Sequence, residues 1–73
     1  MVIYEEDIRN RINRLENQLK DNAALYSIVS DDNLKRQLLM QSFNIESQLQ
    51  GLYYTLGLEY KYKYLKDNNY EIL

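Results

Sequence analysis

The sequence predicts an all-α fold: an antiparallel helical hairpin with a longer second helix. Three observations support this. Proline is absent and glycine occurs only twice, at Gly51 and Gly57, so little interrupts a helix. Apolar residues recur every three or four positions along two segments. Only a short polar run, Ser30-Asp31-Asp32, separates the segments, which favours a tight antiparallel connection.

The first helix is expected from Glu5 to about Tyr26. Its apolar residues share one face: Ile8, Ile12, Leu15, Leu19, Ala23 and Tyr26. Three acidic residues open it, where the helix dipole favours negative charge. Acid-before-base pairs four residues apart also support a helix: Glu5 with Arg9, Asp7 with Arg11, and Glu16 with Lys20. The end of the helix is open anywhere between Asp21 and Val29.

The connection carries the signature of a helix start. We expect Ser30 to be the N-cap, with Asp31 and Asp32 in the first turn. Val29 can pack on Leu34 as a hydrophobic staple.

The second helix is expected to begin at Asn33 and to carry a wide apolar surface. Its main stripe consists of Leu34, Leu38, Ile45, Leu49, Leu52 and Leu56, with Ser42 in the gap. Leu39, Met40 and Phe43 broaden it on one side. Carried to Lys66, the helix would overhang the first one, and its aromatic end would need a cover. Asn22 and Ser42 lie on otherwise apolar faces, where a polar residue fixes register or faces solvent.

Residues 58–73 allow two interpretations. Either Gly51 or Gly57 can end the second helix. After Gly57 the run from Leu58 to Tyr64 alternates strictly, as in a strand, and residues 67–69 suit a turn before a return strand at 70–73. The same stretch also satisfies a helix, with Leu58, Tyr62 and Leu65 on one side. We favour the helix because an isolated hairpin is marginal in water, and keep a C-terminal β-hairpin after Gly57 as the variant.

The size of the chain points to association. Residues 1–73 form a single small helical domain, and a chain this short struggles to bury enough apolar surface alone. It has no cysteine for disulfides and no histidine, which argues against a zinc site. We therefore expect a homo-oligomer, with a dimer built as a four-helix bundle as the simplest closed form.

Catalytic chemistry finds no support in the residues. Without histidine or cysteine the usual base and nucleophile are missing, and no glycine-rich phosphate loop occurs. The acidic run at Glu5 complements the helix dipole, and the run at Ser30 suits capping better than calcium binding. We expect a non-enzyme without catalytic residues, metal, cofactor or small-molecule substrate.

The segment from Tyr53 to Lys66 mixes tyrosine with lysine. Such a run could stack on single-stranded nucleic acid, but a net charge of −2 makes nucleic acid an improbable partner. We favour a protein interface, because tyrosine gives large contact area at low entropic cost. The candidate interface residues are Met40, Phe43, Tyr53, Tyr54, Tyr60, Tyr62 and Tyr64.

Three functions follow as expectations. The first is a small interaction module that binds a larger protein as inhibitor, adaptor or regulator, as many bacterial and phage regulators do. The second is a structural assembly subunit, and the third a single-stranded nucleic-acid binder. The N-terminal residues resemble no signal peptide, and the longest aliphatic run, Leu38-Leu39-Met40, cannot span a bilayer. We therefore expect a cytoplasmic protein without membrane contact.

Overall fold

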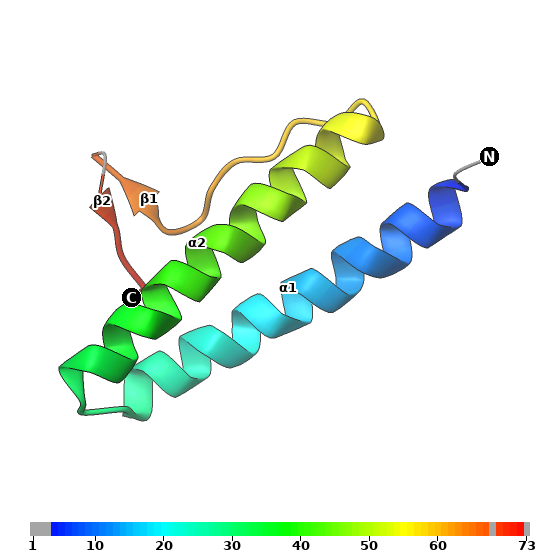
Figure 1. Ribbon diagram of the computed structural model, residues 1–73. Coiled ribbons are helices and arrows are strands. Elements are labelled where there is room, and N and C mark those ends of the chain that lie inside the picture. Colours follow the sequence, from blue (N-terminus) through cyan, green and yellow to red (C-terminus); the bar gives the residue numbers. More distant parts are fainter. Residues whose placement is uncertain (1–3, 68, 73) are drawn as a thin grey trace.

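The computed structural model describes residues 4–67 and 69–72. Helices α1 (Glu5–Ile28) and α2 (Asp32–Thr55) are followed by two short strands, β1 (Leu65–Lys66) and β2 (Asn69–Tyr70). The helices lie side by side as an antiparallel hairpin, and the C-terminal segment folds back along α2 (Figure 1). The predicted all-α hairpin is confirmed.

Helix α1 begins as its acidic first turn predicts. Tyr4 is the N-cap and offers no side-chain hydrogen bond, so the stabilisation comes from the three carboxylates after it. Of the three predicted ion pairs, Glu5 with Arg9 forms, at 2.8 Å. The other two do not form within the described residues. The helix ends at Ile28, inside the range left open by the sequence.

The start of α2 differs from the sequence prediction by one residue. Asp31 is the N-cap, and its Oδ1 accepts a hydrogen bond of 2.9 Å from the backbone N–H of Asn33. Ser30 lies one position too early, and α2 begins at Asp32 instead of Asn33. An aspartate and a serine both cap helices, so composition alone does not choose between neighbours.

Helix α2 ends at Thr55, so the prediction of a longer second helix is wrong. Both helices have 24 residues. Gly57 adopts a φ of 74°, its N–H donates to the Tyr54 carbonyl at 2.9 Å, and the Leu58 N–H donates to the Tyr53 carbonyl at 2.8 Å. This pair of bonds is the Schellman motif, which turns the chain out of the helix. The expected apolar overhang beyond α1 therefore does not exist.

The segment after Gly57 is extended, so the favoured helix at 58–73 is also wrong. We call its described residues, 58–67 and 69–72, the strap. In the strap Tyr60, Tyr62 and Tyr64 are half-buried, whereas Lys61 and Lys63 between them are exposed. The alternation expected of a strand thus reappears in an extended chain laid on α2.

The β-hairpin variant is confirmed in a shorter form. Strands β1 and β2 pair antiparallel, Leu65 opposite Tyr70 and Lys66 opposite Asn69. Asp67 turns the chain with a φ of 49°. The first strand begins seven residues later than the alternation suggested, because residues 58–64 pack on a helix instead of pairing. Asn68 and Leu73 of the predicted turn and return strand lie outside the described residues.

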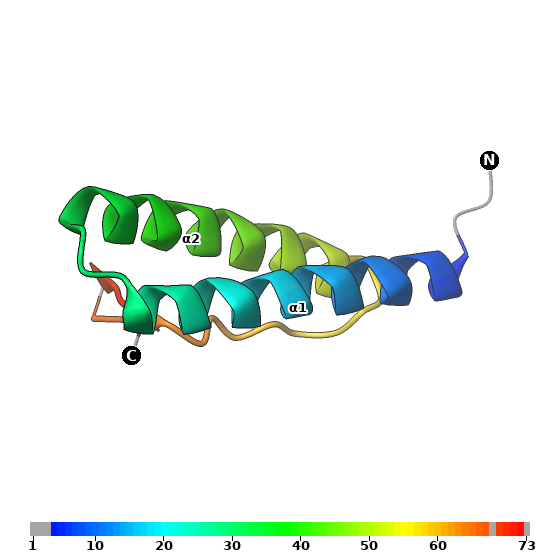
Figure 2. The same cartoon turned by 90° about the horizontal axis from the view of Figure 1, so that it is seen from below.

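The core lies between the two helices and under the strap. Its buried members are Ile8, Ile12, Leu19, Ile45 and Leu49, with Leu15, Leu52, Tyr53, Leu56, Tyr60 and Tyr64 packed against them. Figure 2 shows the strap on one side of the helix pair. Ser42 is fully buried, and the Asn22 Nδ2 lies 3.5 Å from its Oγ, so these two polar residues face each other across the hairpin.

Candidate interaction surfaces

A buried carboxylate on α2 holds the strap. Glu46 is 0% exposed, and its Oε1 accepts hydrogen bonds from the Tyr60 hydroxyl at 2.5 Å and from the Lys63 backbone N–H at 2.9 Å. Among the described residues no basic side chain forms an ion pair with it. A buried charge is tolerated when hydrogen bonds replace its water, and the strap supplies two such donors to Glu46 Oε1.

The second oxygen of this carboxylate lies near Tyr70. Neither Glu46 Oε2 nor the Tyr70 hydroxyl makes a hydrogen bond within the described part of the chain, although both atoms are buried. Burial, together with the Glu46 carboxylate, raises the pKa of Tyr70 well above its ordinary value. Burial also raises the pKa of Tyr60, and the hydrogen bond to Glu46 adds to it. Both phenols therefore stay protonated over a wide pH range, and Tyr60 remains a donor to Glu46 throughout it.

Two other tyrosine hydroxyls join neighbouring elements of the chain. Tyr53 donates to Glu16 of α1 at 2.8 Å, and Tyr62 shares a hydrogen bond of 2.9 Å with Ser47. The Tyr53 and Tyr60 rings meet edge to face at 5.0 Å, a favourable aromatic geometry. Four predicted interface residues, Tyr53, Tyr60, Tyr62 and Tyr64, are therefore half-buried inside the chain.

Three candidates remain on the surface. Tyr54 is 83% exposed and Met40 is 63% exposed, and Phe43 is exposed as well. Tyr54 stands more than two helical turns along α2 from the other two. The structure thus brings together Met40 and Phe43 but leaves Tyr54 apart.

Met40 and Phe43 belong to an apolar patch where α2 meets the strap. Its members line a hollow of about 270 Å³ together with Asn44, and we call Leu39, Met40, Phe43 and Tyr70 the Met-Phe patch. The Phe43 ring packs edge-on against Tyr70 at 5.3 Å and lies 5.7 Å from Tyr62. Two strap tyrosines therefore hold the exposed phenylalanine in one place.

Sequence reasoning missed Tyr70 in this patch. It lies 27 residues after Phe43, and only the turn at Asp67 carries it back to α2. The available signal was the turn composition before it, which predicted a return strand but not the surface that this strand would reach.

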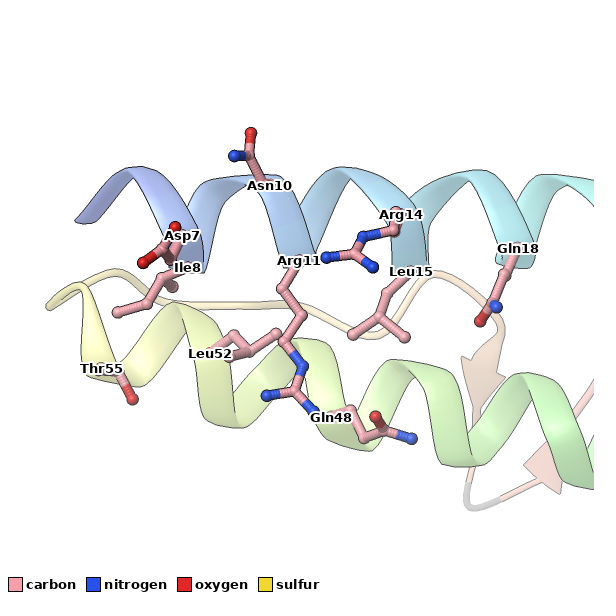
Figure 3. Close-up of a pocket in the computed structure, with 10 residues that line it drawn as sticks. All are labelled: Asp7, Ile8, Asn10, Arg11, Arg14, Leu15, Gln18, Gln48, Leu52 and Thr55. Atoms are coloured by element: carbon pink, nitrogen blue, oxygen red, sulfur yellow. The ribbon is translucent and has the colours of Figure 1, made fainter. Parts of the chain in front are cut away.

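A second surface is the groove on the side of the helix pair away from the strap. Figure 3 shows Arg11 and Leu15 of α1 pointing toward Gln48 and Leu52 of α2, with Arg14 lying along α1 and the strap behind both helices. Two hollows of about 710 and 410 Å³ follow one another along it and share Gln18 and Gln48. We call this surface the open face. Its residues are Asp7, Ile8, Asn10, Arg11, Arg14, Leu15, Gln18, Asp21, Asn22, Gln41, Asn44, Ile45, Gln48, Leu52 and Thr55.

Amide side chains and unpaired arginines dominate the open face. Arg11 and Arg14 make no ion pair with any described residue, although Asp7 was predicted to pair with Arg11. Half-buried Leu15 and Leu52 lie in the wall of the larger hollow. The sequence alone does not mark this surface, because its amides and arginines stand between the apolar stripes that indicate the helices.

The described residues offer no group of three or more acidic side chains suited to a metal ion. No helix in the described part of the chain combines the length and apolar character needed to cross a membrane.

Comparison with known proteins finds no relative of this chain. No family model matches the chain, and no curated protein or solved structure shows significant similarity to it.

Proposed function

We propose that this chain is a non-enzymatic interaction module that binds a larger protein and acts as its inhibitor, adaptor or regulator. The observation that carries the proposal is the Met-Phe patch. It exposes Met40 and Phe43 beside each other while most other large apolar and aromatic side chains of the C-terminal half are buried or half-buried. Exposed apolar patches of this kind mark contact sites on small proteins.

The build of the patch suits a protein partner. Methionine adapts its shape to an apolar surface, whereas the phenylalanine held between two tyrosines offers a rigid ring. The hollow beside them is small, so it fits one apolar side chain from a helix or loop of the partner better than a free ligand.

Substitution of Met40 tests this proposal. A tagged chain carrying Met40→Lys should lose the proteins that copurify with the wild-type chain from its native cell, because a lysine charge would have to be desolvated in the contact. Ile28→Lys is the matched control, since Ile28 is 79% exposed at the hairpin turn and lies outside the patch. Circular dichroism should show unchanged helicity in both variants. Loss of the partners with Ile28→Lys but not with Met40→Lys would contradict the proposal.

The nucleic-acid alternative has weaker support. Base stacking needs free aromatic faces, and the strap rings of Tyr60, Tyr62 and Tyr64 are half-buried against the helices. Lys61 and Lys63 are exposed, so in this alternative they would contact the phosphate backbone of the nucleic acid. Binding of a fluorescent single-stranded oligonucleotide that weakens steeply between low and physiological salt would favour it over the protein module.

A further inference from the structure

The open face changes character along its length. At the hairpin turn its surface continues into two exposed leucines, Leu25 and Leu34. Leu25 follows Gln18 by seven residues and Leu34 precedes Gln41 by seven, so each stands in the same row of its helix as a residue of the groove. The middle is lined by amides. The far end is the larger hollow, about 710 Å³, with Leu15 and Leu52 in its wall and Arg11 and Arg14 at its edge.

Because the two ends of the open face differ in this way, we infer that it binds a second copy of the chain. The two copies lie face to face, related by a two-fold axis that crosses the helices near their midpoints, so that each helix runs antiparallel to its own equivalent. A two-fold contact must be self-complementary, and a face with unlike ends meets that condition when it is turned end over end.

The charges fit this arrangement. Helix α1 runs from residue 5 to residue 28, so full antiparallel overlap brings Asp21 level with residue 12 of the second copy. Residue 12 is one residue from Arg11 and two residues from Arg14, which is about 1.5 and 3 Å along the helix axis. Asp21 of each copy thus meets the two unpaired arginines of the other, and the symmetry forms this contact twice.

The apolar groups fit the same register. Leu25 comes level with Ile8 of the second copy, and Leu34 comes level with residue 53, next to Leu52. Ile8 and Leu52 both line the larger hollow. The exposed leucines at the turn of one copy therefore fill the hollow end of the other, where they replace water against apolar walls.

The area available is enough for a stable dimer. Two helices of 24 residues, packed about 9 Å apart and each about 10 Å wide, present a face of about 36 by 19 Å. Covering it on both copies removes on the order of 1,400 Å² from water, which lies within the range of specific interfaces. The amides in the middle make the contact a polar one, so its register depends on the charges and leucines at the ends.

A charge-swap experiment tests both the dimer and its register. The wild-type chain should sediment as a dimer. Asp21→Arg alone and Arg11→Glu/Arg14→Glu together should each dimerise roughly tenfold or more weakly, since like charges then meet at both ends. An equal mixture of the two variants should recover a dimer containing one of each chain, because every contact is again between opposite charges. All three positions are exposed, so helicity should not change.

Lys20→Glu is the control, because Lys20 is exposed on α1 and lies outside the open face. It should leave the dimer unchanged. A wild-type chain that stays monomeric at several hundred micromolar would overturn the inference. A dimer that survives both charge variants, or a mixture that forms no mixed dimer, would overturn the antiparallel register. Neither result bears on the Met-Phe patch, whose Met40 and Phe43 lie outside the open face.

Discussion

Glu46 is the buried residue of α2 to which the strap is bonded. Its carboxylate is fully buried without a cationic partner among the described residues, and donors from the strap replace water around it. Removal of one donor lowers the stability of the fold, because the charge then stays buried without that hydrogen bond. The strap and the carboxylate therefore stabilise each other.

Removal of one hydroxyl measures this dependence. We predict that Tyr60→Phe lowers the free energy of unfolding by about 1–3 kcal/mol, since Glu46 loses its closest donor while the ring stays in place. Tyr54→Phe is the matched control, because that ring is 83% exposed and its change should cost almost nothing. Urea unfolding followed by circular dichroism compares the two, and equal effects would show that the Glu46 contact contributes little.

The same phenols predict an alkaline limit to stability. The pKa values of Tyr60 and Tyr70 are raised from 10.0, mainly by burial. Below pH 10 these tyrosines keep their protons in both states, so this contribution is complete. Above it the unfolded chain releases protons that the folded chain retains, and the free energy of unfolding falls as the pH rises. Urea unfolding across this range should show the fall, and Tyr60→Phe should make it shallower; an unchanged slope would speak against a buried Tyr60.

Glu46 could not have been selected from the sequence. It stands beside Ile45 on a helix whose other charged residues are exposed or, at Lys35, half-buried, and nothing in its neighbours marks it as fully buried. Its burial depends on Tyr60 and Lys63, which only the path of the strap brings to it. By contrast, the residues of the helix core were predictable, because their three- and four-residue spacing is a local property.

At the scale of elements, Gly57 decides where α2 ends and the strap begins. The sequence offered Gly51 and Gly57 as possible stops, and also allowed the helix to continue through both. The structure separates them by backbone conformation, since Gly57 alone has a positive φ, of 74°. A glycine in this conformation ends a helix at little cost, whereas another residue there is strained.

Alanine at the two glycines should have opposite effects. We predict that Gly57→Ala destabilises the chain by about 1 kcal/mol because alanine resists a positive φ. Gly51→Ala should stabilise it by about 0.5–1 kcal/mol, since a Cβ there meets no atom within 4 Å and helix propensity improves. Thermal unfolding of both variants gives the two signs. A stabilising Gly57→Ala would mean that the helix can continue into the strap.

The strap shows why residues 58–64 were assigned to the wrong element. Their alternation was visible, but a strand normally needs a partner strand, and none was available at that length. In the structure this stretch forms its hydrogen bonds with side chains of α2 instead. The donors are tyrosine hydroxyls and a backbone N–H, such as the N–H of Lys63, which bonds to Glu46. A pattern of residues reports the periodicity of the chain and not the partner that completes its hydrogen bonds.

For the whole molecule, the strap covers one side of the helix pair and leaves the other side open. No aromatic overhang is left uncovered, so association is not expected on that ground. The expectation of association now rests on the open face, on the other side of the helices. It was missed from the sequence because its two rows come from different helices and meet only once the hairpin has formed.

Two leucine substitutions separate the stability of the fold from association. Leu49 is fully buried, so Leu49→Ala should lower the free energy of unfolding by about 2–5 kcal/mol. Leu25 is exposed near the hairpin turn, so Leu25→Ala should leave the fold intact at low concentration. It should nevertheless weaken the dimer, because Leu25 fills the hollow of the second copy.

Thermal unfolding over a range of concentrations distinguishes these effects. The melting temperature of the wild-type chain should rise with concentration, because a dimer that binds only folded chains stabilises them by mass action. Leu25→Ala should flatten this dependence while keeping the low-concentration melting temperature. Leu49→Ala should instead lower the melting temperature at every concentration. A wild-type melting temperature that does not depend on concentration would mean that the open face stays uncovered and that the strap alone completes the fold.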